Sequence, residues 1–390
     1  MDIQKGYLFI TDITGYTRFL TQSELDHAKE ILDAIFDSIL EHLNPPIIIS
    51  GTQGDAIVCY FPEEAFIQSQ SIIEEMEHIY YDFRHQLSLM KLNTTCTCKA
   101  CVNMALLDLK IFLHYGQYML QQIGDKVDLQ GTDVILIHRL MKNAVKDKFG
   151  WSGYGLITEA AVDAIGITGL TENMHEHTEQ VEHFDDARMF IYNLNQAWEA
   201  QWERDRQVVT REEALAWAEI FVPVPQWVAW DVSLNHEFKR RFLGLDVHTR
   251  LDNPEARMAP GAKYHCVHNI NDLDSIVLDM DAPNYITSRN TNTVLGLSYP
   301  ITLSFRPVEG GTMFAVLYGM PDVEISEENV AEYRTSAEFT ANSFTEIIEE
   351  EIAAGRVQPE QLEEIAGKKG EHLRPGVDQG RFASLAGKNI

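Results

Sequence analysis

Two aspartates near the start of the chain occupy positions where a carboxylate is costly unless a cation binds it. Asp12 follows the apolar run 7–10, and Asp55 directly precedes the apolar run 56–61. Each carboxylate stands where a strand that is expected to be buried meets a glycine-containing turn, and a divalent cation offsets the cost of placing a charge there. We therefore expect the two aspartates to form one metal and phosphate site. The alternative for either residue is an aspartate that only caps a turn.

Three of the five cysteines lie close together in a polar segment: Cys96, Cys98 and Cys101. The Cys-x-Cys-x-x-Cys spacing is that of a thiolate metal site that lacks one ligand, and Zn²⁺ is the metal we expect first. The fourth ligand could be His85, His114 or Cys59, and the sequence does not choose among them. An iron–sulfur cluster and three reduced surface thiols are the alternatives. Such a site would be structural or redox-sensing, and separate from the aspartate site.

Bulk composition limits the classes of partner. The 390-residue chain carries a formal net charge of -28, so its field repels long nucleic acids and anionic membrane surfaces. A small triphosphate can still bind if a metal ion supplies positive charge. No apolar run reaches the roughly 18 to 20 residues that span a bilayer. Because the start of the chain also lacks the pattern of a signal peptide, we expect a cytoplasmic protein.

The first half predicts an α+β sandwich in which helices cover a mainly antiparallel sheet. Apolar residues at steps of three and four predict a helix over 25–43, which Pro45 and Pro46 end. Thr158 is expected to cap a later helix. The other expected elements are a hairpin of 47–49 with 56–61, a helix over 63–89, a strand pair turning at Gly116, a helix over 132–142 and strands over 155–157 and 189–194.

The second half predicts strands followed by one long helix, 331–354, with Phe339, Phe344, Ile347 and Ile348 on one stripe. The expected strands begin with 220–225 and continue with 262–267, 275–280, 285–288 and a hairpin of 301–305 with 312–318. We predict a first domain over 1–195, a helical linker over 196–215, a second domain over 216–356 and a mobile tail over 357–390.

Four motifs in order resemble the class III nucleotidyl cyclase catalytic domain. The motifs are Asp12-Ile13-Thr14-Gly15-Tyr16-Thr17, Gly54-Asp55, His114-Tyr115-Gly116 and the run from Asp128 to Arg139, which follows the family pattern Asp-x-x-Gly-x-x-Val-Asn-x-x-x-Arg. The resemblance covers roughly residues 6–194. It implies a ferredoxin-like α/β sandwich and a homodimer, with each active site formed by the metal aspartates of one chain and the arginine of the other.

The resemblance also implies roles for individual residues. Two Mg²⁺ or Mn²⁺ ions would be held by Asp12, Asp55 and the backbone carbonyl of Ile13, and would promote attack of a 3′-hydroxyl on the α-phosphate of a nucleoside triphosphate. Arg139 would stabilise charge on the transferred phosphoryl group, and Asp128 would read the base. Backbone amides would cradle the triphosphate at Thr14, Gly15, Tyr16 and Thr17.

Two positions depart from the family pattern. Ile135 replaces the asparagine that orients the ribose in the transition state, and Gly51 replaces a base-selecting lysine or glutamate. Gln53 or Gln130 could read a base edge instead. Losing an orienting group at such a site costs on the order of a hundredfold in rate. The domain is then a weak cyclase, a cyclase with another substrate, or a nucleotide-binding relic.

The second half is similar to START-like, polyketide-cyclase-type helix-grip domains in its order of elements and in its opening segment 219–231. In those domains a curved sheet wraps the C-terminal helix around an apolar cavity, which implies a hydrophobic small-molecule ligand. Candidate lining residues are Tyr264, His268, Tyr285, Arg306 and Tyr318.

Three functions follow from the two resemblances. The first is a signalling protein in which the ligand-binding domain biases a nucleotidyl-cyclase-like dimer. The second is a nucleotide- or ligand-binding regulator without turnover. The third is a carrier of apolar small molecules on a dimerising scaffold.

Overall fold

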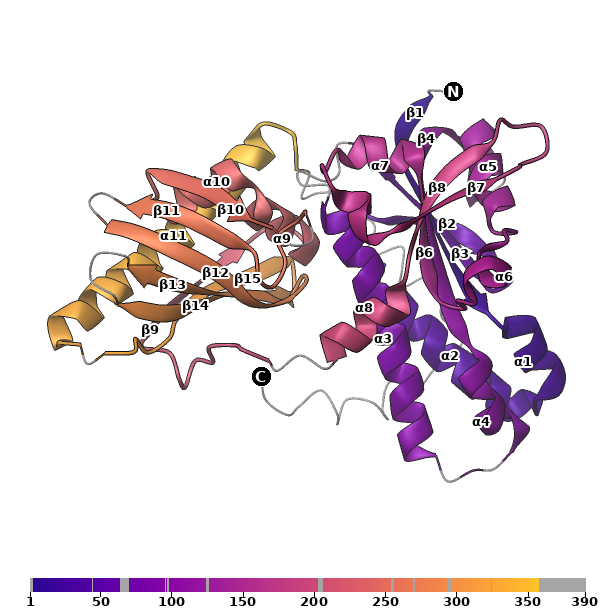
Figure 1. Ribbon diagram of the computed structural model, residues 1–390, viewed down its shortest axis with the longest axis horizontal. Coiled ribbons are helices and arrows are strands. Elements are labelled where there is room, and N and C mark those ends of the chain that lie inside the picture. Colours follow the sequence, from indigo (N-terminus) through magenta and orange to yellow (C-terminus); the bar gives the residue numbers. More distant parts are fainter. Residues whose placement is uncertain are drawn as a thin grey trace. The chain divides into compact units, whose positions relative to one another are not determined.

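The computed structural model divides into two compact units (Figure 1). The first contains Met1–Asp205 with Pro254–Met258, and the second contains Arg206–Asn253 with Ala259–Ile390. The residues that the structure describes are 3–43, 45–63, 70–94, 96, 98–123, 126–202, 206–253, 256–268, 271–292, 297–323 and 325–357. The predicted tail, apart from Val357, lies outside these ranges.

The first unit is built on an eight-stranded sheet with the order β2-β3-β1-β4-β6-β8-β7, in which β5 pairs with β4. Its pairings are antiparallel except for the parallel pair of β4 and β6, so the predicted mainly antiparallel sheet is confirmed. The strands are β1 (Gln4–Thr14), β2 (Ile48–Gln53), β3 (Ala56–Pro62), β4 (Asp108–Ile123), β5 (Lys126–Gln130), β6 (Tyr154–Thr158), β7 (His175–Glu179) and β8 (Ala187–Tyr192).

Helices cover both faces of this sheet because β1 is apolar on both sides. Tyr7 and Phe9 pack with the longest helices of the unit, whereas Leu8 and Ile10 pack with Val134 on the opposite face. The first face is covered by α2 (Leu25–His42), α3 (Gln70–Asn93) and α7 (Glu159–Ile165), and the second by α5 (Thr132–Leu140) and α6 (Val145–Phe149). The remaining helical segments are α1 (Tyr16–Gln22), α4 (Lys99–Asn103), η2 (Met104–Leu106), η3 (Leu170–Asn173) and α8 (Leu194–Trp202).

One predicted turn is wrong, because β4 runs without interruption through Gly116. Gly116 pairs with Gly6 in the β1–β4 ladder, and the side chain of Asp133 packs against its Cα. The glycine therefore makes room for a neighbouring carboxylate within a strand and does not turn the chain. The predicted cap is confirmed, since the Thr158 side chain accepts a hydrogen bond from the backbone amide of Ala161 at the start of α7.

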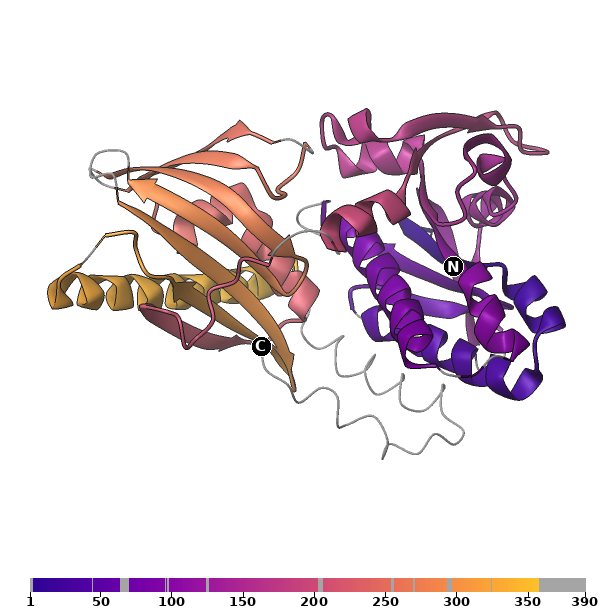
Figure 2. The ribbon, with the colours of Figure 1, turned by 60° about the horizontal axis from the view of Figure 1, so that its bottom comes forward.

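The second unit contains a seven-stranded antiparallel sheet with the order β10-β11-β12-β13-β14-β15-β9. Its strands are β9 (Ala216–Val222), β10 (Val247–Asp252), β11 (Lys263–His268), β12 (Asn271–Asp281), β13 (Tyr285–Asn292), β14 (Ser298–Val308) and β15 (Gly311–Tyr318). Its helices are α9 (Gln226–Leu234), α10 (His236–Phe242) and α11 (Glu327–Ala353), of which α11 lies across the sheet (Figure 2).

Aromatic rings fill the space between α11 and this sheet. Phe344 stacks on Phe314 with ring centroids 4.1 Å apart, and Phe242 meets Phe344 edge-on at 5.2 Å. The predicted stripe on α11 is confirmed for Phe344, Ile347 and Ile348, which are buried, and wrong for Phe339, which is 49% exposed. Phe339 precedes Phe344 by five residues, which rotates its side chain about 140° away from the stripe.

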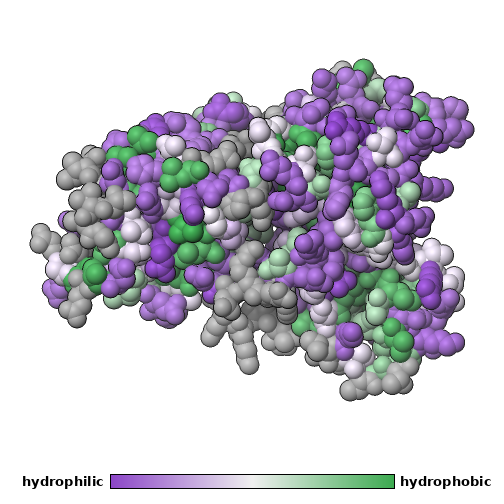
Figure 3. Space-filling view, viewed as in Figure 1, coloured by the Kyte–Doolittle hydropathy of each residue, from purple (hydrophilic) through white to green (hydrophobic). Residues whose placement is uncertain are grey.

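None of the described helices is long and apolar enough to cross a membrane. On the face seen in Figure 3, apolar residues form separate patches among hydrophilic ones.

Candidate functional site

The β-ladder brings Asp12 and Asp55 together. Asp12 on β1 pairs with Ala56 on β3, and Asp55 is the residue directly before Ala56. Gly54 makes the turn before Asp55 with φ of 67°, a conformation that favours glycine. The same register places Lys110 of β4 on the other side of Asp12. Two carboxylates and one ammonium group therefore converge at the end of β1.

All three side chains are partly buried. The Nζ atom of Lys110 lies 3.5 Å from Oδ2 of Asp12, and the two side chains are only 18% and 15% exposed. Partial burial raises the pKa of the Asp55 carboxyl, the charge of Asp12 raises it further, and the charge of Lys110 opposes the rise. The proximity of Lys110 was not predicted from the sequence.

The turn after Asp12 is fixed by contacts that require a glycine. Gly15 has φ of 86° directly before α1, and a Cβ atom there would lie 2.5 Å from the carbonyl oxygen of Leu106 in η2. Thr14 donates a hydrogen bond from Oγ1 to the carbonyl of Ser152 at 2.9 Å, and the Ile13 side chain is buried in the core. Because the Ile13 side chain is buried, a ligand in this turn could contact only the backbone of Ile13.

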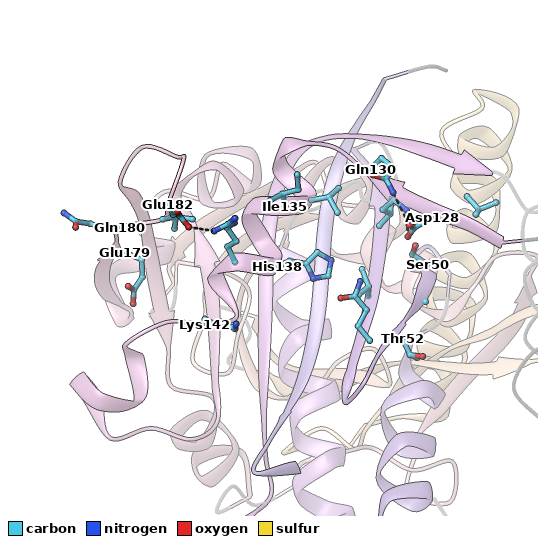
Figure 4. Close-up of a pocket in the computed structure, with 18 residues that line it drawn as sticks. Ser50, Thr52, Asp128, Gln130, Ile135, His138, Lys142, Glu179, Gln180 and Glu182 are labelled. Carbon is cyan, nitrogen blue, oxygen red and sulfur yellow. Dashed lines mark hydrogen bonds and ion pairs between the residues drawn. The ribbon is translucent and has the colours of Figure 1, made fainter. Parts of the chain in front are cut away.

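A pocket of about 970 Å³ collects the other predicted site residues (Figure 4). It brings Gly51, Asp128, Ile135 and Arg139 together, although they come from β2, β5 and α5. Its lining consists of residues 50–53, 127–130 and 179–182 with Val58, Val134, Ile135, His138, Arg139 and Lys142.

Arg139 and Asp128 each have a partner within the pocket. Arg139 Nη1 lies 3.4 Å from Oε2 of Glu182, and both side chains are exposed. The Gln130 amide donates a hydrogen bond to Asp128 at 3.1 Å (Figure 4). Burial lowers the pKa of His138, although Asp128 partly opposes this. A ligand in the pocket could therefore bind the Arg139 guanidinium and the Asp128 carboxylate only in competition with Glu182 and Gln130.

The predicted residues fall into two groups within one chain. Neither Asp12 nor Asp55 is among the described residues that line the pocket, and Arg139 and Asp128 are.

The third motif has a structural role in this chain. His114 is buried on β4, where its Nδ1 atom lies 2.8 Å from the hydroxyl of Thr158, and Nε2 lies 3.6 Å from Asp133. Asp133 also accepts a hydrogen bond from the amide of Gln117 at 2.6 Å. The His-x-Gly step and Asp133 together fix the start of α5, which carries Ile135 and Arg139.

The cysteine segment gathers around a ligand that the sequence did not indicate. Each of His27, Cys96, Cys98 and Cys101 offers an atom that could bind a metal, and these atoms lie within 4.8 Å of one another. The three predicted candidates for the fourth ligand are wrong. His114 contacts the hydroxyl of Thr158, and Cys59 is buried in β3. His85 on α3 is not one of the four residues whose ligand atoms lie together.

A smaller cavity of about 100 Å³ lies inside the second unit, between α10, α11 and the sheet. Two of the predicted lining residues, Tyr264 and Tyr318, line it. Tyr285 instead donates a hydrogen bond to Asp279 at 2.7 Å, and Arg306 is exposed. The side chain of His268 lies outside the described part of the chain.

The cavity wall also carries a buried amine. Lys239 of α10 lines the cavity and is 7% exposed, and burial lowers its pKa to about 8. Burial raises the pKa of the Cys266 thiol to about 11 and lowers that of His248 to about 3. At neutral pH the cavity thus presents one cationic group beside a thiol and a neutral imidazole.

Sequence comparisons match parts of the chain. The family model described as "Protein of unknown function (DUF2652)" matches residues 30–149. The uncharacterized protein Rv2561/Rv2562 of Mycobacterium tuberculosis (strain ATCC 25618 / H37Rv) is 38% identical over 63 residues, which are 16% of this chain and 30% of that protein. The match therefore spans less than a third of that relative.

Solved structures of cyclases are similar to the chain at low identity. A bacterial light-regulated adenylyl cyclase has a TM-score of 0.40 at 15% identity, over 50% of this chain and 53% of that one. The guanylyl cyclase Cya2 has a TM-score of 0.38 at 16% identity, over 49% of this chain and 92% of that one. The match thus spans about half of the light-regulated enzyme.

Proposed function

We propose that the first unit binds a nucleoside triphosphate with Mg²⁺ or Mn²⁺ and is a divergent nucleotidyl-cyclase-like domain. The observation that carries the proposal is the register of β1 against β3, which puts Asp12 beside Asp55 next to the Gly15 turn. Partial burial and the charge of Asp12 raise the pKa of the Asp55 carboxyl, and a bound cation would favour its ionised form.

The donor set fits hard divalent ions. The Asp12 and Asp55 carboxylates and the Ile13 carbonyl offer only oxygen atoms, which Mg²⁺ and Mn²⁺ prefer. When bound, two such ions would supply charge neutralisation at the phosphates and activation of the attacking hydroxyl. The backbone of Thr14 to Thr17 would face the triphosphate. Lys110 competes with a metal ion for Asp12, and its ammonium could pair with a phosphate oxygen once Asp12 binds metal.

We further propose a homodimer in which each complete site combines two chains. This is supported by the separation of the metal aspartates from the pocket that holds Asp128 and Arg139. In a dimer the pocket of one chain would receive the base and phosphates of a nucleotide held by Asp12 and Asp55 of the other. Arg139 would leave Glu182 and contact the transferred phosphoryl group.

Turnover is expected to be slow. Ile135 is 53% exposed on the pocket wall and has no hydrogen-bonding group to orient a ribose. Gly51 gives no side chain to select a base, and the space beside its Cα is open, since a Cβ atom there would meet no other atom within 4 Å. Binding without product would make the protein a nucleotide-binding regulator, which is the second candidate.

The test is incubation of the full-length protein with ATP, GTP, CTP or UTP and Mn²⁺, followed by mass spectrometry of the products. A cyclic mononucleotide that the Asp55→Asn variant does not form would support catalysis. Nucleotide binding without product in a parallel calorimetric titration would support the regulator. Absence of both binding and product would overturn the proposal for this unit.

For the second unit we propose a START-like, helix-grip ligand-binding domain. Its support is the cavity under α11, whose wall combines leucine, isoleucine and valine side chains with Lys239, His248, Asn290 and several hydroxyls. The ligand would be a small molecule with an apolar body and an acidic group facing Lys239. Mass spectrometry of material that copurifies with the protein would identify it, and a ligand with no effect on nucleotide binding would favour the carrier function over signalling.

A further inference from the structure

Four side chains from two distant segments place ligand atoms around one point in the first unit. His27 belongs to α2, whereas Cys98 and Cys101 flank the start of α4, and Cys96 precedes them. The Nδ1 atom of His27 lies 3.2 Å from Sγ of Cys98 and 3.7 Å from Sγ of Cys96. We infer that these four residues bind one structural Zn²⁺ ion.

The distances are close to those of a tetrahedral zinc site. Bonds of about 2.3 Å to sulfur and about 2.0 Å to nitrogen place neighbouring ligand atoms roughly 3.5 to 3.8 Å apart. A disulfide would instead need sulfurs about 2.05 Å apart. All five cysteines lie in the described ranges, and none forms a disulfide. Three thiolates with one imidazole are a donor set typical of structural zinc.

Hydrogen bonds to the sulfurs provide the surroundings that thiolate ligands need. The amide of Cys98 points to the sulfur of Cys96 at 3.5 Å, and the amide of Cys101 points to the sulfur of Cys98 at 3.4 Å. The Thr94 hydroxyl donates to Cys101 at 3.6 Å. Each donor reduces the negative charge that a sulfur carries, which orients the ligands and lowers the cost of gathering three thiolates.

The site would fasten α4 to the junction of α1 and α2. Beside the cluster, the amide of Ala100 donates to Glu24 at 3.1 Å, and Asn103 donates to the carbonyl of Gln22 at 3.2 Å. The following segment η2 places Leu106 directly behind Gly15. A metal at the cluster therefore stabilises the segment that supports the Gly15 turn. The zinc inference does not depend on nucleotide binding at that turn.

The test is metal analysis of the full-length protein, purified under reducing conditions, by inductively coupled plasma mass spectrometry. We expect about one Zn²⁺ per chain in the wild type. We expect at least a tenfold loss of zinc affinity in Cys98→Ser and in His27→Asn, measured against a chromophoric chelator. Two matched controls, Cys266→Ala and His183→Asn, change residues outside the cluster and should keep the full zinc content.

A second measurement keeps the inference testable if Cys98→Ser fails to fold. Co²⁺ added to the reduced, zinc-free wild type should give the visible bands of a tetrahedral thiolate site, and these bands should change in His27→Asn. Chelation of zinc should lower the wild-type melting temperature by roughly 5 °C or more. Three results would each overturn the inference. The first is a wild type that holds no zinc and gives no such cobalt spectrum. The others are an iron–sulfur spectrum and full zinc content in both cluster variants.

Discussion

The ammonium of Lys110 lies 3.5 Å from Oδ2 of Asp12, which faces it from the neighbouring strand. This pair lies at the position where the proposed metal ion would bind, so a cation of the protein itself and a divalent ion compete for one carboxylate. The competition gives the site a property that can be measured without knowing its nucleotide.

Removing the competitor should strengthen metal binding. In Lys110→Met, we expect Mn²⁺ to bind about tenfold more tightly, because a positive charge close to the ion has been deleted. Electron paramagnetic resonance of free Mn²⁺ gives the affinity. Lys5→Met changes an exposed lysine at the start of β1 and should have no effect. Equal affinities in the wild type and Lys110→Met would show that the metal does not bind at Asp12.

The same lysine should set the pH dependence of metal binding. Only the ionised Asp55 carboxylate binds metal, so Mn²⁺ affinity should fall as the pH decreases toward its raised pKa. Lys110 lowers that pKa, so its removal should shift the decline to higher pH. Titrations from pH 7 downward toward the ordinary pKa of an aspartate compare the two proteins. Superimposable pH profiles would argue against contact between Lys110 and the metal site.

Restoring the family's asparagine should restore chemistry. Ile135 is 53% exposed on the pocket wall, so Ile135→Asn should fold like the wild type. We expect cyclic nucleotide formation to rise by about tenfold or more, because the amide can orient the ribose. Val127→Asn, at another exposed apolar residue of the same pocket, is the control. Equal product formation in the wild type and Ile135→Asn would show that residue 135 does not orient the ribose, and no product from either would indicate that the unit binds nucleotide without acting on it.

Acid should destabilise the first unit through His78. Burial lowers the pKa of His78 from 6.5 to about 4, so the folded state keeps it neutral. The unfolded chain takes up a proton below pH 6.5, and stability is therefore lost as the pH falls from about 6.5 to about 4. At pH 5 this loss is on the order of 2 kcal/mol.

Urea denaturation at pH 7.5 and pH 5 tests the effect of His78. The loss of stability on acidification should be smaller in His78→Gln than in the wild type, whereas the exposed His183→Gln should behave like the wild type. An equal loss in all three proteins would assign the acid sensitivity to other groups.

The second unit should become more stable when its buried amine is replaced. Lys239→Met keeps the length of the side chain and removes a charge whose burial lowers its pKa to about 8. We expect the unit to gain on the order of 3 kcal/mol at pH 7, measured by urea denaturation. The variant should also lose any copurifying acidic ligand. Unchanged ligand content would place the ligand away from Lys239.

Local patterns predicted most of the first unit, because its strands and helices are strongly apolar and end at prolines, glycines or caps. The hairpin of β2 and β3, the cap at Thr158 and the helix that carries Arg139 were all predicted from such signals. The prediction of a turn at Gly116 was wrong because a glycine can either form a turn or leave room for a neighbouring side chain within a strand. The neighbour here is Asp133, which is 17 residues away in the sequence.

The sequence could not show which charged residues meet. Lys110 has the pattern of an ordinary polar residue in a strand, and only the register of β1 against β4 places it beside Asp12. His27 has the pattern of a surface residue of an amphipathic helix, and it meets Cys98 across 71 residues of chain. The edge strand β10 escaped prediction because exposed polar and charged side chains such as Thr249 and Asp252 interrupt its apolar residues.

The central claim is that Asp12 and Asp55 hold the divalent ions of a bound nucleotide. The most direct measurement is Mn²⁺ affinity by electron paramagnetic resonance, with and without a nucleoside triphosphate, in the wild type, Asp55→Asn and Asp37→Asn, the last at an exposed aspartate of α2. We predict binding that the nucleotide strengthens in the wild type and in Asp37→Asn, and at least a tenfold loss in Asp55→Asn. Equal Mn²⁺ binding in all three proteins, or no binding in the wild type, would contradict the claim.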